Sequence, residues 1–216
     1  QGIEKIIAEA PIDNLAATYN NVAWGLAEKG ENLAVAENIS EAATTWAKNN
    51  IQNPSGKKPS YNSSKEWEQT RKNIYAMYAD TYAFILYKKG DFKKGFEFAK
   101  DAAEARKFAD SEYNDRYALL LEKTAAPDEV KKKIEAIYAN GKAGADAKEV
   151  LKRAYIAVNK SENGYASYVA ELDALAKAKL KEELRSKLID EPASMFTLVN
   201  LQGDQVKLED YKGKTV

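Results

Sequence analysis

Residues 79–104 read ADTYAFILYKKGDFKKGFEFAKDAAE, two apolar stripes at helical spacing that meet at Gly90-Asp91. Gly and Asp side by side between two periodic segments are typical of a turn. Small residues at Ala83, Gly95 and Ala102 allow two paired helices to approach closely. The stretch therefore predicts a helical hairpin.

The same helical period extends over most of the chain. We expect Asp146 to cap the helix that follows it, and the leucine stripe of the last helix to pack on the domain. A loop rich in Asn, Ser, Pro and Lys interrupts the pattern over residues 52–64. The fold class predicted is all-α, a bundle of about eight to nine helices. The expected helices span about 13–29, 32–49, 65–89, 92–108, 112–124, 127–139, 146–158 and 163–188.

The hairpins at 12–49 and 65–107 resemble tetratricopeptide repeats. The second hairpin matches best, and its matching positions are Ala79, Tyr82, Ala83, Leu86, Gly90-Asp91-Phe92, Gly95, Ala99 and Ala102. The first departs from the pattern, because Trp24 stands where a small residue is usual. The two turns lie 60 residues apart, whereas a regular array repeats about every 34. We interpret them as two degenerate repeats in an irregular helical domain.

This resemblance implies a binding groove, because the first helix of each repeat lines the concave face in that family. The positions carried over are Thr18, Asn21, Gly25 and Glu28 with Met77, Asp80, Phe84 and Tyr87. Among them Asn21, Met77, Asp80, Phe84 and Tyr87 form the candidate surface for a protein or peptide, and Asn21 would hydrogen-bond an extended backbone. The alternative is that the aromatic residues of 75–87 are interhelical core.

Residues 191–216 leave the helical pattern. Pro192 stops the preceding helix. Two short apolar runs, 196–201 and 206–208, flank a turn at Gln202-Gly203-Asp204, which predicts a β-hairpin.

The segment also resembles the opening of the redoxin and TlpA/ResA-like branch of the thioredoxin superfamily. The matching residues are Pro192, Phe196, Leu198, Gly203, Val206, Leu208, Asp210, Tyr211, Lys212, Gly213, Lys214 and Val216. In that family a central strand and a Cys-x-x-Cys site follow. The resemblance implies a helical accessory domain over 1–190 and an incomplete thioredoxin-like domain from 191 to 216.

On this interpretation the protein is an exported thiol–disulfide oxidoreductase of the periplasm or cell envelope, whose helical part binds a client protein or forms a homodimer. Since the chain begins at Gln1 without Met, we expect a processed or cloned piece whose signal peptide is not included. Two alternatives remain: a free-standing peptide-binding scaffold without redox chemistry, and a glycan- or nutrient-binding helical protein.

Composition excludes several classes of site. The chain has no Cys and no His, which removes thiol catalysis, Ser-His-Asp machinery and the usual zinc ligands. Lys+Arg and Asp+Glu both number 33, so no global charge attracts nucleic acid. No apolar run approaches the ~20 residues of a membrane span. We therefore predict no catalytic, cofactor-binding or metal-ligating residue, and no transmembrane segment.

Overall fold

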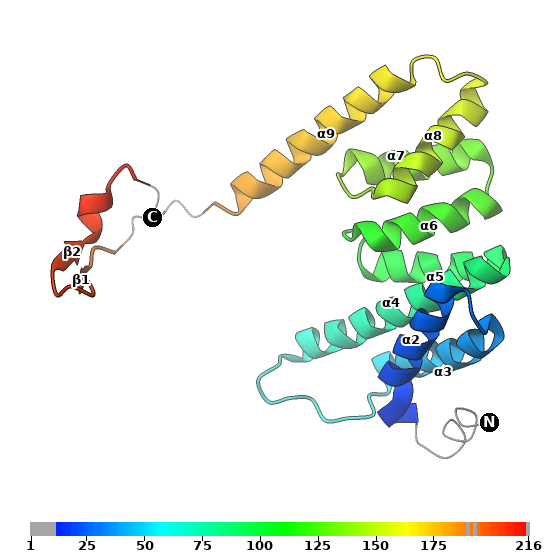
Figure 1. Cartoon of the computed structure of the whole chain (residues 1–216), viewed down its shortest axis with the longest axis horizontal. Coiled ribbons are helices and arrows are strands. Elements are labelled where there is room, and N and C mark those ends of the chain that lie inside the picture. The colour runs from blue at the N-terminus through cyan, green and yellow to red at the C-terminus, as the bar shows by residue number, and fades with distance from the viewer. Residues whose placement is uncertain (1–11, 189–190, 192–193, 215–216) are drawn as a thin grey trace. The chain divides into compact units, whose positions relative to one another are not determined.

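The computed structural model describes residues 12–188, 191 and 194–214, and most of them are helical (Figure 1). The predicted helical bundle with a C-terminal β-hairpin is confirmed. Within the described residues the helices are α2 Ile12–Lys29, α3 Leu33–Gln52, α4 Ser64–Lys89, α5 Phe92–Ala105, α6 Ser111–Thr124, α7 Pro127–Ala139, α8 Ala145–Asn159 and α9 Tyr165–Ser186.

Packing divides the chain into two compact units, Gln1–Leu180 and Lys181–Val216. The boundary predicted from the sequence, between 190 and 191, lies ten residues later and stays a prediction.

Local sequence explains where the long helix α4 begins and ends. The Ser63 hydroxyl accepts from the Glu66 N–H, and the Glu66 carboxylate accepts from the Ser63 N–H, which forms a capping box. At the other end Gly90 takes φ 83°, a left-handed conformation that glycine adopts without steric cost. Asp91 then caps α5 by accepting from the Lys94 N–H. The predicted turn at Gly90-Asp91 is thus formed as expected.

The start of α8 differs from the prediction. Asp146 lies inside the first turn of the helix and does not cap it. The cap comes from Asp115 of α6, whose carboxylate accepts from the Ala147 N–H at 3.0 Å and from the Asp146 N–H at 3.4 Å. This carboxylate lies so close to Gly144 that a Cβ there would stand 2.1 Å from Oδ2. The N–H groups of α8 are therefore satisfied by a different helix.

Helices of the first unit pack in chain order, each on the next, as Figure 1 shows from α2 to α8. The helices α2, α4, α6 and α8 also contact one another in succession. The predicted close approach of α4 and α5 occurs at Gly95, where a Cβ would lie 3.3 Å from Cβ of Leu86 and 3.5 Å from the carbonyl oxygen of Ala83; the same Cβ would lie 3.0 Å from Cδ2 of Leu120 in α6. Ala83, Ala99 and Leu120 are fully buried there and lie between a core on α2–α4 and a core on α6–α8.

The last helix, α9, contacts the end of α7 as far along as Ala176 and Lys179, where a Cβ on Gly141 would lie 3.6 Å from Cβ of Ala176 and Lys179 Nζ donates to Asn140 Oδ1. Leu172 is buried, and Tyr138 of α7 donates a 3.0 Å hydrogen bond to Asp173. Of the leucines that follow in the first unit, Leu175 is 52 % and Leu180 is 54 % exposed, and in the second unit Leu184 and Leu188 are exposed as well. The expectation that the whole stripe packs on the domain is therefore wrong.

The second unit contains the predicted β-hairpin. Strands β1 Thr197–Val199 and β2 Gln205–Lys207 are antiparallel, and a short 3₁₀ helix, Leu208–Tyr211, follows. Gly203 has φ 91°, and the Asn200 side chain accepts from the Asp204 N–H at 2.8 Å, so the turn is held locally. Pro192, predicted to stop the preceding helix, lies outside the described residues.

Candidate functional site

Two of the candidate residues on α4, Phe84 and Asp80, contact side chains of neighbouring helices at one place. Phe84 of α4 stacks on Trp24 of α2 with 5.2 Å between ring centroids. The guanidinium of Arg116, from α6, lies 4.0 Å from the centroid of the same Phe84 ring. We call these three residues the aromatic row. It crosses α2 and α4, which carry the positions expected to line a groove, and it extends to α6, for which no such expectation was made.

Asp80, one turn before Phe84, forms an ion pair with Arg116. Asp80 Oδ1 and Arg116 Nε are 3.6 Å apart, and the two side chains are only 16 % and 15 % exposed. This distance is too long for a hydrogen bond, and neither atom has a hydrogen-bond partner in the described part of the chain. Burial raises the pKa of Asp80 to about 6, with Glu112 and Asp110 adding to the rise and Arg116 opposing it. The Asp80 carboxyl of this ion pair therefore gains or loses its proton close to neutral pH.

The other candidates lie apart from this ion pair. Asn21 and Met77 are exposed. Asn21 lies one helical turn before Trp24 of the aromatic row, and Met77 lies one helical turn before Asp80, the ion-pair partner of Arg116. Spacing of three residues places each pair on one helix face. Tyr87 is half-buried, and its ring packs at a tilt against Phe92 of α5, with 5.8 Å between centroids.

The alternative interpretation, that the aromatic residues of 75–87 are core, holds for part of the set. Tyr75, Tyr78 and Tyr82 are buried among the helices, whereas Phe84 and Tyr87 remain partly accessible.

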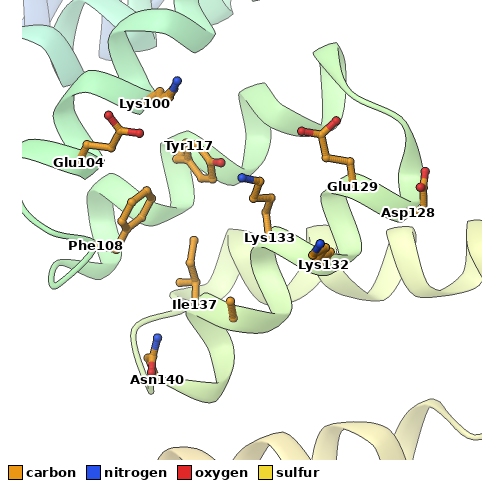
Figure 2. Close-up of a pocket in the computed structure, with 11 residues that line it drawn as sticks. Lys100, Glu104, Phe108, Tyr117, Asp128, Glu129, Lys132, Lys133, Ile137 and Asn140 are labelled. Atoms are coloured by element: carbon orange, nitrogen blue, oxygen red, sulfur yellow. The ribbon is translucent and has the colours of Figure 1, made fainter.

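A pocket of about 710 Å³ opens between α5 and α7, with α6 at its floor (Figure 2). Tyr117, Phe108 and Ile137 supply its apolar lining, and Figure 2 shows Glu104 and Glu129 on opposite sides of Tyr117. We call it the α5–α7 pocket. Its remaining lining residues are Lys100, Asp128, Lys132, Lys133, Ala136 and Asn140.

Tyr117 is 5 % exposed, and its hydroxyl makes no hydrogen bond to any described residue. Its ring packs against Phe96 and Phe108 at centroid distances of 5.6 and 5.4 Å. Burial raises the pKa of Tyr117 to about 12, and the charges of Glu104 and Glu129 contribute to the rise. The hydroxyl is thus a neutral donor at physiological pH, and it lies in the pocket without an acceptor.

The charged rim of the pocket is also unpaired. None of its six ionisable residues forms an ion pair within the described part of the chain, although ion pairs are frequent elsewhere, as between Arg153 and Glu122 at 2.6 Å. Three carboxylates and three ammonium groups therefore surround one concave site with their charges available. The six residues are Lys100, Glu104, Asp128, Glu129, Lys132 and Lys133.

Sequence reasoning missed both Arg116 and the α5–α7 pocket. On α7 the charges recur at four-residue spacing, which is typical of a solvated helix face and gives no sign of a pocket. Arg116 is one of several arginines among ordinary helical residues. Only the packing of α4 on α6 shows that its guanidinium reaches Phe84.

Among the described residues no group of His, Asp and Glu could hold a metal ion, and no helix is long and apolar enough to cross a membrane. Comparisons with protein-family models, curated proteins and solved structures find no match to the chain.

Proposed function

We propose that the helical unit is a protein-interaction module that binds an extended peptide segment along the aromatic row. The observation that carries this proposal is the contact of Trp24, Phe84 and Arg116 across three helices. Trp, Arg and other residues that combine apolar area with a polar group dominate the binding energy of protein interfaces.

Unused hydrogen-bonding capacity near the row supports the proposal. The indole N–H of Trp24 makes no hydrogen bond within the described residues, and Asn21, one turn earlier, is exposed. An indole donor and an amide that both donates and accepts suit the alternating groups of an extended backbone. Met77 adds an exposed, adaptable apolar contact on α4.

A peptide-display selection against the chain tests the proposal. We expect Asn21→Ala combined with Met77→Ala to weaken the selected peptides about tenfold, because both side chains are exposed and their removal leaves the core intact. Trp24→Ala should weaken them further. Lys93→Ala, at an exposed position on α5, is the matched control and should bind like the parent. Selected peptides that bind all four proteins equally would contradict the proposal.

A second candidate function rests on the C-terminal segment. We propose that the helical module serves an exported thiol–disulfide oxidoreductase of the periplasm or cell envelope, by binding the client whose disulfide is exchanged. The redoxin-like run from Leu208 to Val216 supports this, as does the turn at Gly203 between two short strands. In such an enzyme a thiolate attacks the client disulfide and forms a mixed disulfide before the second thiolate releases it.

Sequencing the native gene beyond Val216 tests this second function. A strand followed by Cys-x-x-Cys is the expected result, and insulin reduction by the full-length protein would then measure the activity. A stop codon with no such motif would leave the free-standing peptide-binding scaffold, which the display experiment tests independently.

A further inference from the structure

We infer that the α5–α7 pocket is a second binding site, for a peptide segment that carries one basic and one acidic side chain. The inference rests on the proposed function only in taking the partner to be a protein. The site shares no residue with the aromatic row, so the two can be tested separately.

The basic side chain is assigned to the space between Glu104 and Glu129. These carboxylates come from opposite walls, on α5 and α7, with Tyr117 between them (Figure 2). The charges of both contribute to the raised pKa of the Tyr117 hydroxyl. Neither has a basic partner within the described residues. A guanidinium or ammonium group there would neutralise two carboxylates and lie near the aromatic ring of Tyr117, an additional attraction for a cation.

The acidic side chain is assigned to the lysines of the rim. On α7 the order is Asp128-Glu129 and then, one turn later, Lys132-Lys133. Lys100 adds a third unpaired ammonium group from α5. A ligand with charges of one sign would leave half of these groups facing like charge, whereas a ligand with both signs can match both halves.

The floor of the pocket requires a hydrogen-bond acceptor. The hydroxyl of Tyr117 points into the space between the two walls and has no acceptor of its own (Figure 2). A peptide carbonyl supplies one, while Phe108 and Ile137 offer apolar contact to the aliphatic part of the segment. The volume of about 710 Å³ lies within the range of ligand-binding pockets, which is roughly 300 to 1,000 Å³.

Backbone amide NMR shifts of the full chain, titrated with defined blocked peptides, test the site. The probes are acetyl-Gly-Arg-Ala-Glu-Gly-amide, the same peptide with Arg and Glu exchanged, and a control with Gln at both charged positions. We expect at least one charged peptide to give saturable shifts over residues 100–108, 117 and 128–140, and to bind about tenfold more tightly than the Gln control.

Variants decide whether the assigned groups carry the binding. Glu104→Gln with Glu129→Gln should weaken the charged peptide about tenfold, and Tyr117→Phe about threefold to tenfold, because each removes only the group assigned to the ligand. Glu97→Gln, which changes an exposed carboxylate elsewhere on α5, is the matched control and should bind like the parent.

Two results would overturn the inference: no saturable shift at the pocket with either charged peptide, or equal binding by the parent and the double Glu variant. Trp24→Ala should leave these titrations unchanged. A failure here is therefore distinct from a failure of the aromatic row.

Discussion

Arg116 and Tyr117 are consecutive residues of α6, yet they face opposite kinds of surroundings. Arg116 points toward α4, where it pairs with Asp80 and stacks on Phe84. Tyr117 lines the α5–α7 pocket, where its hydroxyl and the charges around it have no partner among the residues that the structure describes. Because successive residues of a helix point about 100° apart, one helix contributes to both regions.

The comparison teaches that a buried charge and a solvated charge on the same helix differ in whether the fold pairs them more than in residue type. The guanidinium of Arg116 is largely buried, and it forms an ion pair with the carboxylate of Asp80. The carboxylates and ammonium groups of the pocket are solvated and form no ion pair with described residues, so they can form ion pairs with a ligand. Removing one group of the buried Asp80–Arg116 pair should therefore cost stability, whereas removing a charge of the pocket should change ligand binding and leave stability nearly unchanged.

The largest expected loss of unfolding free energy comes from a substitution of Arg116. Arg116→Met leaves the Asp80 carboxyl buried without its counter-charge, and we expect it to cost about 3 kcal/mol of unfolding free energy at pH 7. Urea unfolding followed by circular dichroism measures this. The control is Arg153→Met, which breaks the Arg153–Glu122 pair, whose arginine is 50 % exposed; it should cost less than about 1 kcal/mol. Equal losses would remove the distinction between the two pairs.

A smaller effect is expected from the titration of Asp80. Its pKa is about 6 in the fold against a usual 3.8, so the folded state holds the proton more tightly than the unfolded chain. The stability that protonated Asp80 contributes is fully present below pH 3.8 and is lost as the pH rises through about 6. Relative to Asp80→Asn, the parent should lose about 2–3 kcal/mol between pH 4 and pH 7. Urea unfolding at intervals of one pH unit measures this, and parallel curves for the two proteins would refute it.

The smallest effect on stability is expected in the pocket. Tyr117→Phe removes a hydroxyl without a partner, so unfolding free energy should change by no more than about 0.5 kcal/mol. Tyr138→Phe is the matched comparison, because it removes the hydroxyl that donates to Asp173 at 3.0 Å, and it should cost about 1–2 kcal/mol. Thermal unfolding of the two variants checks the order. A larger loss for Tyr117→Phe would mean that its hydroxyl has a structural partner.

Helix positions could be predicted from the sequence, because they depend on local signals. Gly90-Asp91 and the small residues Ala83 and Gly95 act within one hairpin, and the structure places them as expected. Trp24 departs from the repeat pattern, and its ring contacts Phe84 of the next hairpin. A large side chain at a small position signals an unusual contact but not its partner.

The remaining features depend on contacts between distant residues. The packing of α4 on α6 determines that Asp80 meets Arg116. The α5–α7 pocket exists because α5 and α7 stand apart over α6, and no local period encodes that separation. Leu175 belongs to a regular stripe that spacing alone assigns to the core, and only its surroundings show that it is exposed.

The Asp115 cap on α8 has a consequence for how the unit assembles. A capping residue normally lies next to its helix in the sequence, but Asp115 is 32 residues before Ala147, whose N–H group its carboxylate accepts from. The start of α8 gains its hydrogen bonds only when α6 is already in place, so the two helices should form cooperatively. A fragment beginning at Gly144 would lack this stabilisation, and nucleation of α8 would depend on its neighbour more than on its own sequence.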